Sequence, residues 1–205
     1  MKLIGITGGA GAGKTRLLQH IEARLQDRTR IILADEVGHI VRRRGELGYD
    51  PLVALLGADV LDAEGEIDRG RMAEKIFADP SLREKTNQII HPAVNAWIRG
   101  EIDRERARGA LSLLFIEAAL LIENGYTAIV DEMWYIRVSD VVRRERLRKK
   151  RGYDEARIDG IFASQLSDDA FMAHADVVID NNGTVESACA QIDRELLRLG
   201  EALDA

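Results

Sequence analysis

The chain has 205 residues, of which 46% are hydrophobic and 31% are charged, and its formal net charge is -6. This composition is typical of a folded globular protein and excludes a disordered or fibrous chain. The negative charge argues against a nucleic-acid partner, because a general nucleic-acid-binding surface is basic.

The cysteine content and the apolar runs indicate where such a chain works. Cys189 is the single cysteine, so no internal disulfide can form, which favours a reducing compartment. The longest apolar run, residues 110–122, contains Glu117 and is too short to cross a bilayer. The first residues enter a strand-like segment and do not resemble a signal peptide. We therefore expect a cytoplasmic protein with no membrane partner.

Short apolar runs that end at turn residues predict five buried strands. The predicted strands are Lys2 to Thr7, Arg30 to Ala34, Leu111 to Ile116, Met133 to Val138 and Asp176 to Ile179. Segments with helical spacing of apolar residues separate them, and this alternation predicts an α/β fold with a parallel sheet flanked by helices.

The predicted helices divide the chain into a core and two helical parts. The segments are Thr15 to Leu25, Leu52 to Leu56, Arg69 to Ala78, Ser81 to Arg108, Asp140 to Lys150, Asp154 to Gln165 and Val185 to Leu199. About 75 residues lie between the second and third strands, too many for one crossover. We expect a core of residues 1–35, 109–140 and 175–205, a helical substrate lobe of 36–108 and a helical lid of 141–174.

The segment between the first strand and the first helix has the pattern G-x-x-x-x-G-K-[ST]. It reads Gly8-Gly9-Ala10-Gly11-Ala12-Gly13-Lys14-Thr15. Glycines let successive backbone N–H groups turn inward around phosphates, and the helix adds its positive amino end. Lys14 supplies a charge for the β- and γ-phosphates, and the Thr15 hydroxyl is a ligand for Mg²⁺. The segment therefore predicts a site for ATP with Mg²⁺.

A phosphate loop alone leaves the phosphoryl acceptor open. A GTPase needs an N-K-x-D segment, which is absent, and the D-x-x-G pattern at Asp35 to Gly38 lacks that companion. An ATP-driven motor needs a second acidic strand-end signature and a longer chain. A small-molecule kinase suits the length, the helical insertion and the basic segment best.

Asp35 follows the second predicted strand, at the sheet edge where ligands bind in open α/β folds. A carboxylate there can orient and deprotonate an acceptor hydroxyl, although an N-cap for the next helix is an equally good interpretation. His39 lies one helical turn further on and faces the same side, where it either binds substrate or is structural.

A dense basic cluster occupies the predicted lid. Its members are Arg143, Arg144, Arg146, Arg148, Lys149, Lys150 and Arg151. Such a run is often only a solvated helix face. Next to a triphosphate site, a closing arm with arginines can also stabilise the charge that develops in phosphoryl transfer. We select Arg146 and Arg151 for this role.

Over nearly its whole length the chain resembles the dephospho-coenzyme A kinase family. The matching segments are Ile4-Gly5-Ile6-Thr7-Gly8-Gly9, Ala34-Asp35 with His39, Ile67-Asp68-Arg69, Ile76-Phe77, Ile90-His91-Pro92-Ala93-Val94, Leu120-Leu121-Ile122-Glu123, Arg146-Leu147 with Arg151, Gln165, and Ala175-Asp176-Val177-Val178-Ile179-Asp180-Asn181-Asn182-Gly183. Their order and spacing together carry the resemblance.

The resemblance implies a P-loop kinase fold and transfer of the ATP γ-phosphoryl group to the ribose 3′-hydroxyl of dephospho-coenzyme A. It implies that Asp35 is the base and that Arg146 clamps the phosphates. It further implies that Arg69 and His91 belong to the substrate lobe and that Asn181 to Gly183 lie near the adenine of ATP. From the residues alone, a helix break before Pro92 explains His91 equally well.

Several positions depart from the family pattern. Leu33 stands where an Asp is usual, and Phe171-Met172 stand where an Arg is common. Ala119 replaces a usual Pro. Arg16, which we include among the predicted ATP-binding residues, follows Thr15 where a small hydroxyl residue is common. These departures leave two alternatives: a kinase for another small acceptor such as a nucleoside or nucleotide, or an ATP-binding regulator with impaired catalysis.

Overall fold

The computed structural model describes residues 1–118 and 120–204, so the departure at Ala119 lies outside the described residues. The chain forms two compact units. The first contains Met1–Ile31 and Arg108–Ala205, and the second is Ile32–Ala107. Among the described residues, no helix is long and apolar enough to span a membrane.

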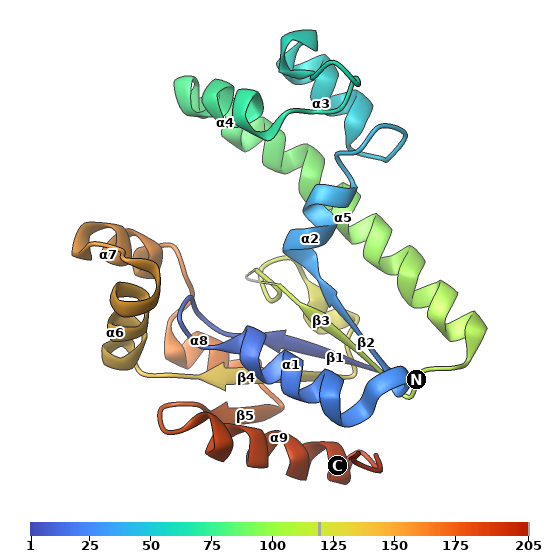
Figure 1. The fold of residues 1–205 in the computed structure, drawn as a ribbon, viewed down its shortest axis with the longest axis vertical. Helices are drawn as coiled ribbons and strands as arrows, with labels where there is room; N and C mark the ends of the chain where they lie inside the picture. Colours follow the sequence, from blue (N-terminus) through green and yellow to red (C-terminus); the bar gives the residue numbers. More distant parts are fainter. Residues whose placement is uncertain (119, 205) are drawn as a thin grey trace. The chain divides into compact units, whose positions relative to one another are not determined.

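The first unit is built on a five-stranded sheet with the strand order β2-β3-β1-β4-β5 (Figure 1). The strands are β1 Lys2–Thr7, β2 Thr29–Leu33, β3 Leu113–Glu117, β4 Glu132–Arg137 and β5 Val177–Asp180. Parallel pairing joins β1 to both β3 and β4, and β4 to β5. The predicted five-stranded α/β architecture is confirmed: β1 has its predicted ends, and the ends of the other strands are shifted by one or two residues.

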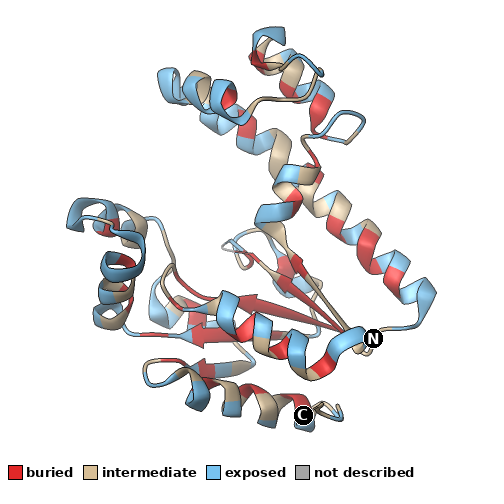
Figure 2. Ribbon diagram, in the orientation of Figure 1, coloured by how far each residue is buried: buried red, intermediate tan, exposed pale blue. Residues whose placement is uncertain are grey.

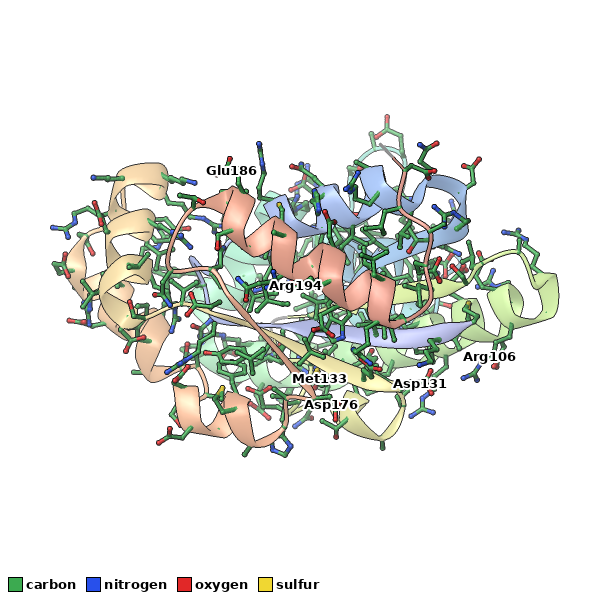
Figure 3. The ribbon with its side chains drawn as sticks, turned by 90° about the horizontal axis from the view of Figure 1, so that it is seen from below. Arg106, Asp131, Met133, Asp176, Glu186 and Arg194 are labelled. Carbon is green, nitrogen blue, oxygen red and sulfur yellow. The ribbon has the colours of Figure 1, made fainter. Side chains whose placement is uncertain are left out.

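The helices of the first unit flank the sheet or belong to the lid segment (Figure 1). They are α1 Lys14–Leu25, α6 Asp140–Arg151, α7 Glu155–Ala163, α8 Asp168–Ala173 and α9 Val185–Arg198. α1 and α9 lie side by side on one face, and α8 packs against β4 on the other (Figures 1 and 3). The central strands are buried along most of their length, as expected for a sheet covered on both sides (Figure 2).

The lid segment differs from the prediction at its second helix. α7 ends at Ala163, so Gln165 lies in the connection to α8 and not in the helix. The last turn tightens because Ser164 and Gln165 donate backbone hydrogen bonds to carbonyls only three residues earlier. The hydroxyl of Ser167 then caps α8, a helix that the sequence analysis did not predict.

Two aspartates fix the strands at the edge away from the phosphate loop (Figure 3). Asp131 Oδ2 accepts from the backbone N–H of Leu3 at 2.7 Å, and Asp176 Oδ2 accepts from that of Met133 at 2.7 Å. Each carboxylate therefore satisfies the N–H group of the second residue of a strand, in β1 and in β4, which is a structural role.

The second unit is helical. Its elements are α2 Ala34–Ile40, α3 Tyr49–Leu56, the short 3₁₀ helix η2 Ala58–Val60, α4 Arg69–Ala78 and α5 Pro80–Arg108. Its core contains Leu52, Leu56, Val60 and Met72. Asp68 caps α4, because its side chain accepts from the backbone N–H of Arg71.

Two sequence interpretations in this unit are wrong. α5 continues through Pro92, so no helix break explains His91; the proline removes one backbone donor without ending the helix. Leu33 occupies the N-cap position of α2, and Asp35 lies in the first helical turn, so Asp35 is not the cap. The helix begins directly at the end of β2 and includes Ala34, which the prediction had placed in the strand.

Candidate functional site

The loop between β1 and α1 has the backbone of an anion site. Gly11 and Gly13 have φ angles of 82° and 88°, which residues with a Cβ rarely adopt. Gly13 is the N-cap of α1, and no side chain in the described part of the chain caps that end. The amino end of α1 therefore keeps its positive partial charge and N–H groups for a phosphate.

Two loop glycines are required because neighbouring groups approach closely. A Cβ on Gly8 would lie 2.7 Å from the carbonyl oxygen of Ile136, and one on Gly13 would lie 2.7 Å from Nδ2 of Asn181. The loop is thus seated between the ends of β4 and β5, and a larger residue at either position would displace it.

Lys14 points back over the loop. Its ammonium donates to the carbonyl oxygen of Gly8 at 2.6 Å and lies 3.3 Å from Oε1 of Glu117. Glu117 ends β3, the strand beside β1, so the two side chains meet at the carboxyl edge of the sheet. The sequence analysis did not select Glu117. The available signal was an acidic residue at the end of a buried strand.

Arg146 reaches the phosphate loop from α6. Its Nη2 donates to the carbonyl oxygen of Asn181 at 2.8 Å, and its Nη1 lies 3.5 Å from that of Ala12. Asn181, 3% exposed, donates from Nδ2 to the same Ala12 oxygen at 2.7 Å. Three predicted site residues therefore lie together, although their contacts with ATP remain a prediction.

Arg143, which we had not selected, makes the more extensive contact with the loop. Its Nε donates to the carbonyl oxygen of Ala10 at 2.9 Å, and the residue is only 8% exposed. Burial lowers the pKa of its guanidinium, with Asp140 acting in the opposite direction. Spacing within the basic cluster could not separate this buried arginine from its less buried neighbours.

The remaining predicted ATP-site residues are exposed. Thr15 and Arg16 are exposed in the first turn of α1, and Gly183 is exposed before α9. Arg151 is the last residue of α6, where a hydrogen bond to Tyr153 lowers the pKa of that phenol. Their roles toward ATP stay predictions.

The second unit contains a cavity of about 600 Å³ next to α2. Its walls combine apolar side chains with basic ones. They are His39, Arg42, Arg69, Met72, Ala73, Ile76, Phe77, Pro80 and Arg83. The structure thus brings together His39 and Arg69, which were predicted, and adds Arg42 and Arg83. His91 is half-buried on α5 and is not among the residues that line this cavity.

His39 lies beside two cationic side chains at the wall of this cavity. Burial, followed by the charges of Arg42 and Arg69, lowers the pKa of its imidazole. Arg42 also hydrogen-bonds Nδ1 of His39, which fits an unprotonated nitrogen at that position. Asp35 and His39 lie one helical turn apart on α2, and both are exposed.

The two lid departures have different surroundings. Phe171 is buried and stacks on Tyr135, with ring centroids 4.9 Å apart, so it belongs to the packing between α8 and the sheet. Met172 is 41% exposed. Phe171 thus contributes to the core of the first unit.

Comparisons with known proteins match most of the chain to dephospho-CoA kinases. A family model described as dephospho-CoA kinase matches residues 2–187. A dephospho-CoA kinase of Streptococcus mutans is 36% identical over 200 residues, covering 97% of this chain and 98% of that protein. One from Anaeromyxobacter dehalogenans is 33% identical, covering 97% and 92%.

A solved structure gives the same fold. The dephospho-CoA kinase from Campylobacter jejuni has a TM-score of 0.68 and 19% identity, covering 98% of this chain and 100% of that one. Because the phosphate loop, the sheet and the helical unit all fall within the matched region, the chain belongs to the dephospho-CoA kinase family.

Proposed function

We propose that this chain transfers the γ-phosphoryl group of ATP to the ribose 3′-hydroxyl of dephospho-coenzyme A, giving coenzyme A and ADP. The observation that carries the proposal is the phosphate loop with its Lys14–Glu117 pair, set in a chain whose family model covers residues 2–187. ATP is the phosphoryl donor, as the family implies, and the enzyme is a transferase of coenzyme A biosynthesis.

The residues around Lys14 fit Mg²⁺ as a companion of ATP. Mg²⁺ prefers oxygen ligands and usually keeps several waters, so one or two protein oxygens suffice beside phosphate oxygens. The hydroxyl of Thr15, the residue after Lys14, and the carboxylate of Glu117, 3.3 Å from the Lys14 ammonium, supply such oxygens. Within the described residues, no cluster of three acidic, His or Cys side chains forms a separate metal site. The ion would neutralise charge on the β- and γ-phosphates.

The cavity of the second unit suits the acceptor. Dephospho-coenzyme A carries a diphosphate and a long, partly apolar pantetheine arm. Arg69 and Arg83 present cationic donors for phosphate oxygens, and Arg42, which is hydrogen-bonded to Gly38 and His39, adds positive charge beside them. Met72 and Ile76 present an apolar wall. This combination supports binding of the coenzyme at the lobe we expected for it.

The chemical step needs orientation, a proton acceptor and charge stabilisation. Lys14 and the loop N–H groups hold the donor phosphates, and Asp35 accepts the proton of the 3′-hydroxyl as it attacks the γ-phosphorus. Arg146 stabilises the charge on the transferred group from α6. ADP leaves with the displaced oxygen. Because the reaction uses ATP and the single cysteine forms no internal disulfide, we place the enzyme in the cytoplasm.

A coupled ADP-release assay across acceptors tests the proposal. Dephospho-coenzyme A is compared with nucleosides and nucleotides at equal concentration. We expect dephospho-coenzyme A alone to raise ADP release well above the rate with water. Release stimulated only by another acceptor would identify a different kinase. ATP binding without transfer to any acceptor would identify a regulator.

A further inference from the structure

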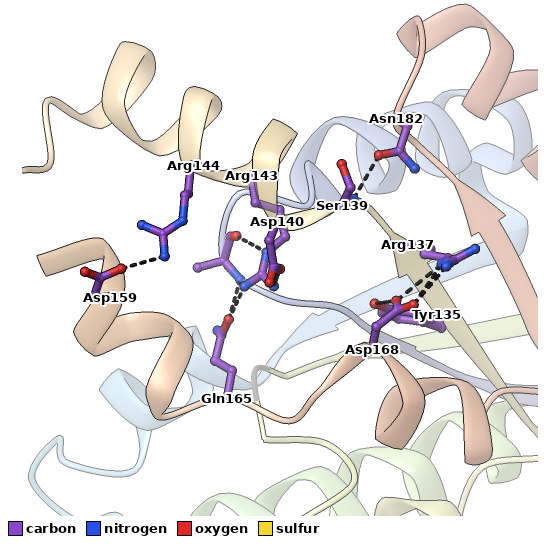
Figure 4. A network of polar contacts seen from close by, with 11 residues as sticks. Tyr135, Arg137, Ser139, Asp140, Arg143, Arg144, Asp159, Gln165, Asp168 and Asn182 are labelled. Atoms are coloured by element: carbon purple, nitrogen blue, oxygen red, sulfur yellow. Dashed lines mark hydrogen bonds and ion pairs between the residues drawn. The ribbon is translucent and has the colours of Figure 1, made fainter. Parts of the chain in front are cut away.

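One residue of the phosphate loop, Ala10, is held by side chains from outside the loop. Arg143 Nε donates to the carbonyl oxygen of Ala10 at 2.9 Å. The backbone N–H of Ala10 donates to Oε1 of Gln165 at 3.1 Å. Arg143 Nη2 donates to the same Gln165 oxygen (Figure 4). Three hydrogen bonds thus close a ring around Ala10.

The guanidinium of Arg143 is fixed on every side. Nη1 pairs with Oδ1 of Asp140 at 3.1 Å, and the ring of Phe162 lies 4.1 Å from the guanidinium carbon. Gly9 leaves the space it needs, because a Cβ there would lie 2.3 Å from Nη2. Each guanidinium nitrogen therefore already has a protein partner, unlike a side chain that waits for phosphate.

Gln165 is anchored as well. Its connection leads into α8, where Asp168 accepts from the hydroxyl of Tyr135 at 2.7 Å and pairs with Arg137 at 2.9 Å (Figure 4). Tyr135 and Arg137 belong to β4, which is hydrogen-bonded to β1. The carboxamide that accepts from Ala10 is therefore tied to the same sheet that carries the loop.

We propose that Arg143 and Gln165 are positioning residues that set the phosphate loop for transfer, and that neither binds phosphate itself. The inference rests on the proposed kinase function. Transfer depends on holding the γ-phosphoryl group in line with its acceptor, and a displacement of 1 Å far from the chemistry can cost about 10²-fold in rate. ATP affinity depends on many loop N–H groups and on Lys14, so it is less sensitive to Ala10 alone.

Arg143→Met tests this against a matched control. Arg144→Met removes the neighbouring arginine, which also lies over Phe162, at 4.9 Å, but pairs with Glu155 and Asp159. We expect Arg143→Met to lower kcat on the order of 10²-fold and to keep the Kd for ATP within about tenfold of the unaltered protein. Arg144→Met should leave both close to unaltered. A parallel rise in Kd would make Arg143 a phosphate ligand and overturn the proposal, as would equal effects of both variants.

Further variants distinguish a positioning role from simple misfolding. Thermal unfolding of each variant, compared with the unaltered protein, detects misfolding. Arg143→Lys keeps the charge but cannot bridge Ala10 and Gln165, so it should also lose kcat; recovery by Lys would show that charge alone matters. Gln165→Met should lower kcat. The double variant with Arg143→Met should have a kcat no lower than that of the less active single variant, because both side chains act through Ala10. Additive losses would contradict a shared role.

Gly9→Ala gives a test by suppression. The added methyl group should displace the guanidinium and lower kcat in the otherwise unaltered protein, but cause little further loss beside Arg143→Ala. An undiminished loss in that double variant would contradict the proposal. If the unaltered protein transfers no phosphate, the kinase function fails. Amide exchange at Ala10, expected to be faster in Gln165→Met, still tests the positioning.

Discussion

Lys14 and Glu117 meet across two neighbouring parallel strands, with 3.3 Å between the ammonium nitrogen and the carboxylate oxygen. Their side chains are 14% and 15% exposed, so each charge depends on the other and on the nearby carbonyl oxygen of Gly8. Removing one partner of such a pair leaves a charge that is poorly compensated. The pair links the phosphate loop to the end of β3.

Lys14→Met should abolish both tight ATP binding and turnover, because the positive charge at the transferred phosphate is lost. Isothermal titration with ATP and the ADP-release assay measure the two effects. Lys2→Met is the control: Lys2 begins β1, the strand that leads into the loop, and its ammonium lies 3.9 Å from Oε1 of Glu132. Retained activity in Lys14→Met would show that the loop is not the donor site.

Glu117→Gln keeps the shape of the side chain but removes its charge. We expect the Mg²⁺ concentration for half-maximal rate to rise, because one of the two protein oxygens proposed for the ion loses its charge. A magnesium titration at saturating ATP gives this value. An unchanged titration curve would limit Glu117 to the pair with Lys14.

Asp35→Asn should spare ATP binding while lowering kcat by roughly 10²–10⁴-fold, the contribution of a positioned acid or base. Glu36→Gln, the next residue on α2 and also exposed, is the control. Equal rates for Asp35→Asn and the unaltered protein would leave Asp35 without a catalytic role, since Leu33 already occupies the cap position.

Arg69→Met and Arg83→Met should raise the KM for dephospho-coenzyme A and leave the Kd for ATP unchanged, because both line the cavity of the second unit. Each lost charged hydrogen bond corresponds to about 1.5–3 kcal/mol, or roughly ten- to a hundredfold in binding. Lys75→Met on α4 is the control, since Lys75 pairs with Asp59 and does not line the cavity. A KM that does not change would place the acceptor elsewhere.

His39 makes a pH-dependent contribution to stability. Its folded pKa is lowered below the ordinary value of 6.5, so the unfolded chain takes up a proton that the folded protein resists. Stability is therefore lost as pH falls from 6.5 toward the lowered pKa. The effect should be small, because the ring is exposed to screening solvent. Thermal unfolding at pH 7.5 and 5.5 should show a smaller acid loss for His39→Gln; an equal loss would contradict this.

Sequence reasoning found the features that local pattern determines. Apolar runs located all five strands, because burial on both faces needs continuous hydrophobic segments. The glycines and Lys14 located the phosphate loop, since few other structures need that spacing. α4 was predicted with its observed ends, and Asp68 caps it as such residues commonly do.

The missed residues depend on contacts between distant segments. Arg143 and Arg144 are neighbours in one basic run, yet only the first is buried, because helix phase and the approach of Gly9 decide which side faces the loop. Gln165 gained its contact because α7 ended early, and Glu117 because β3 lies beside β1. None of these placements leaves a periodic signal in the sequence.

Analysis of the reaction product tests the central claim most directly. The unaltered protein is incubated with ATP, Mg²⁺ and dephospho-coenzyme A, and phosphorus NMR follows the products. The account predicts one new 3′-phosphomonoester for each ADP formed, and none with Lys14→Met. ADP that forms without this phosphomonoester, or a phosphate on another group of the acceptor, would contradict it.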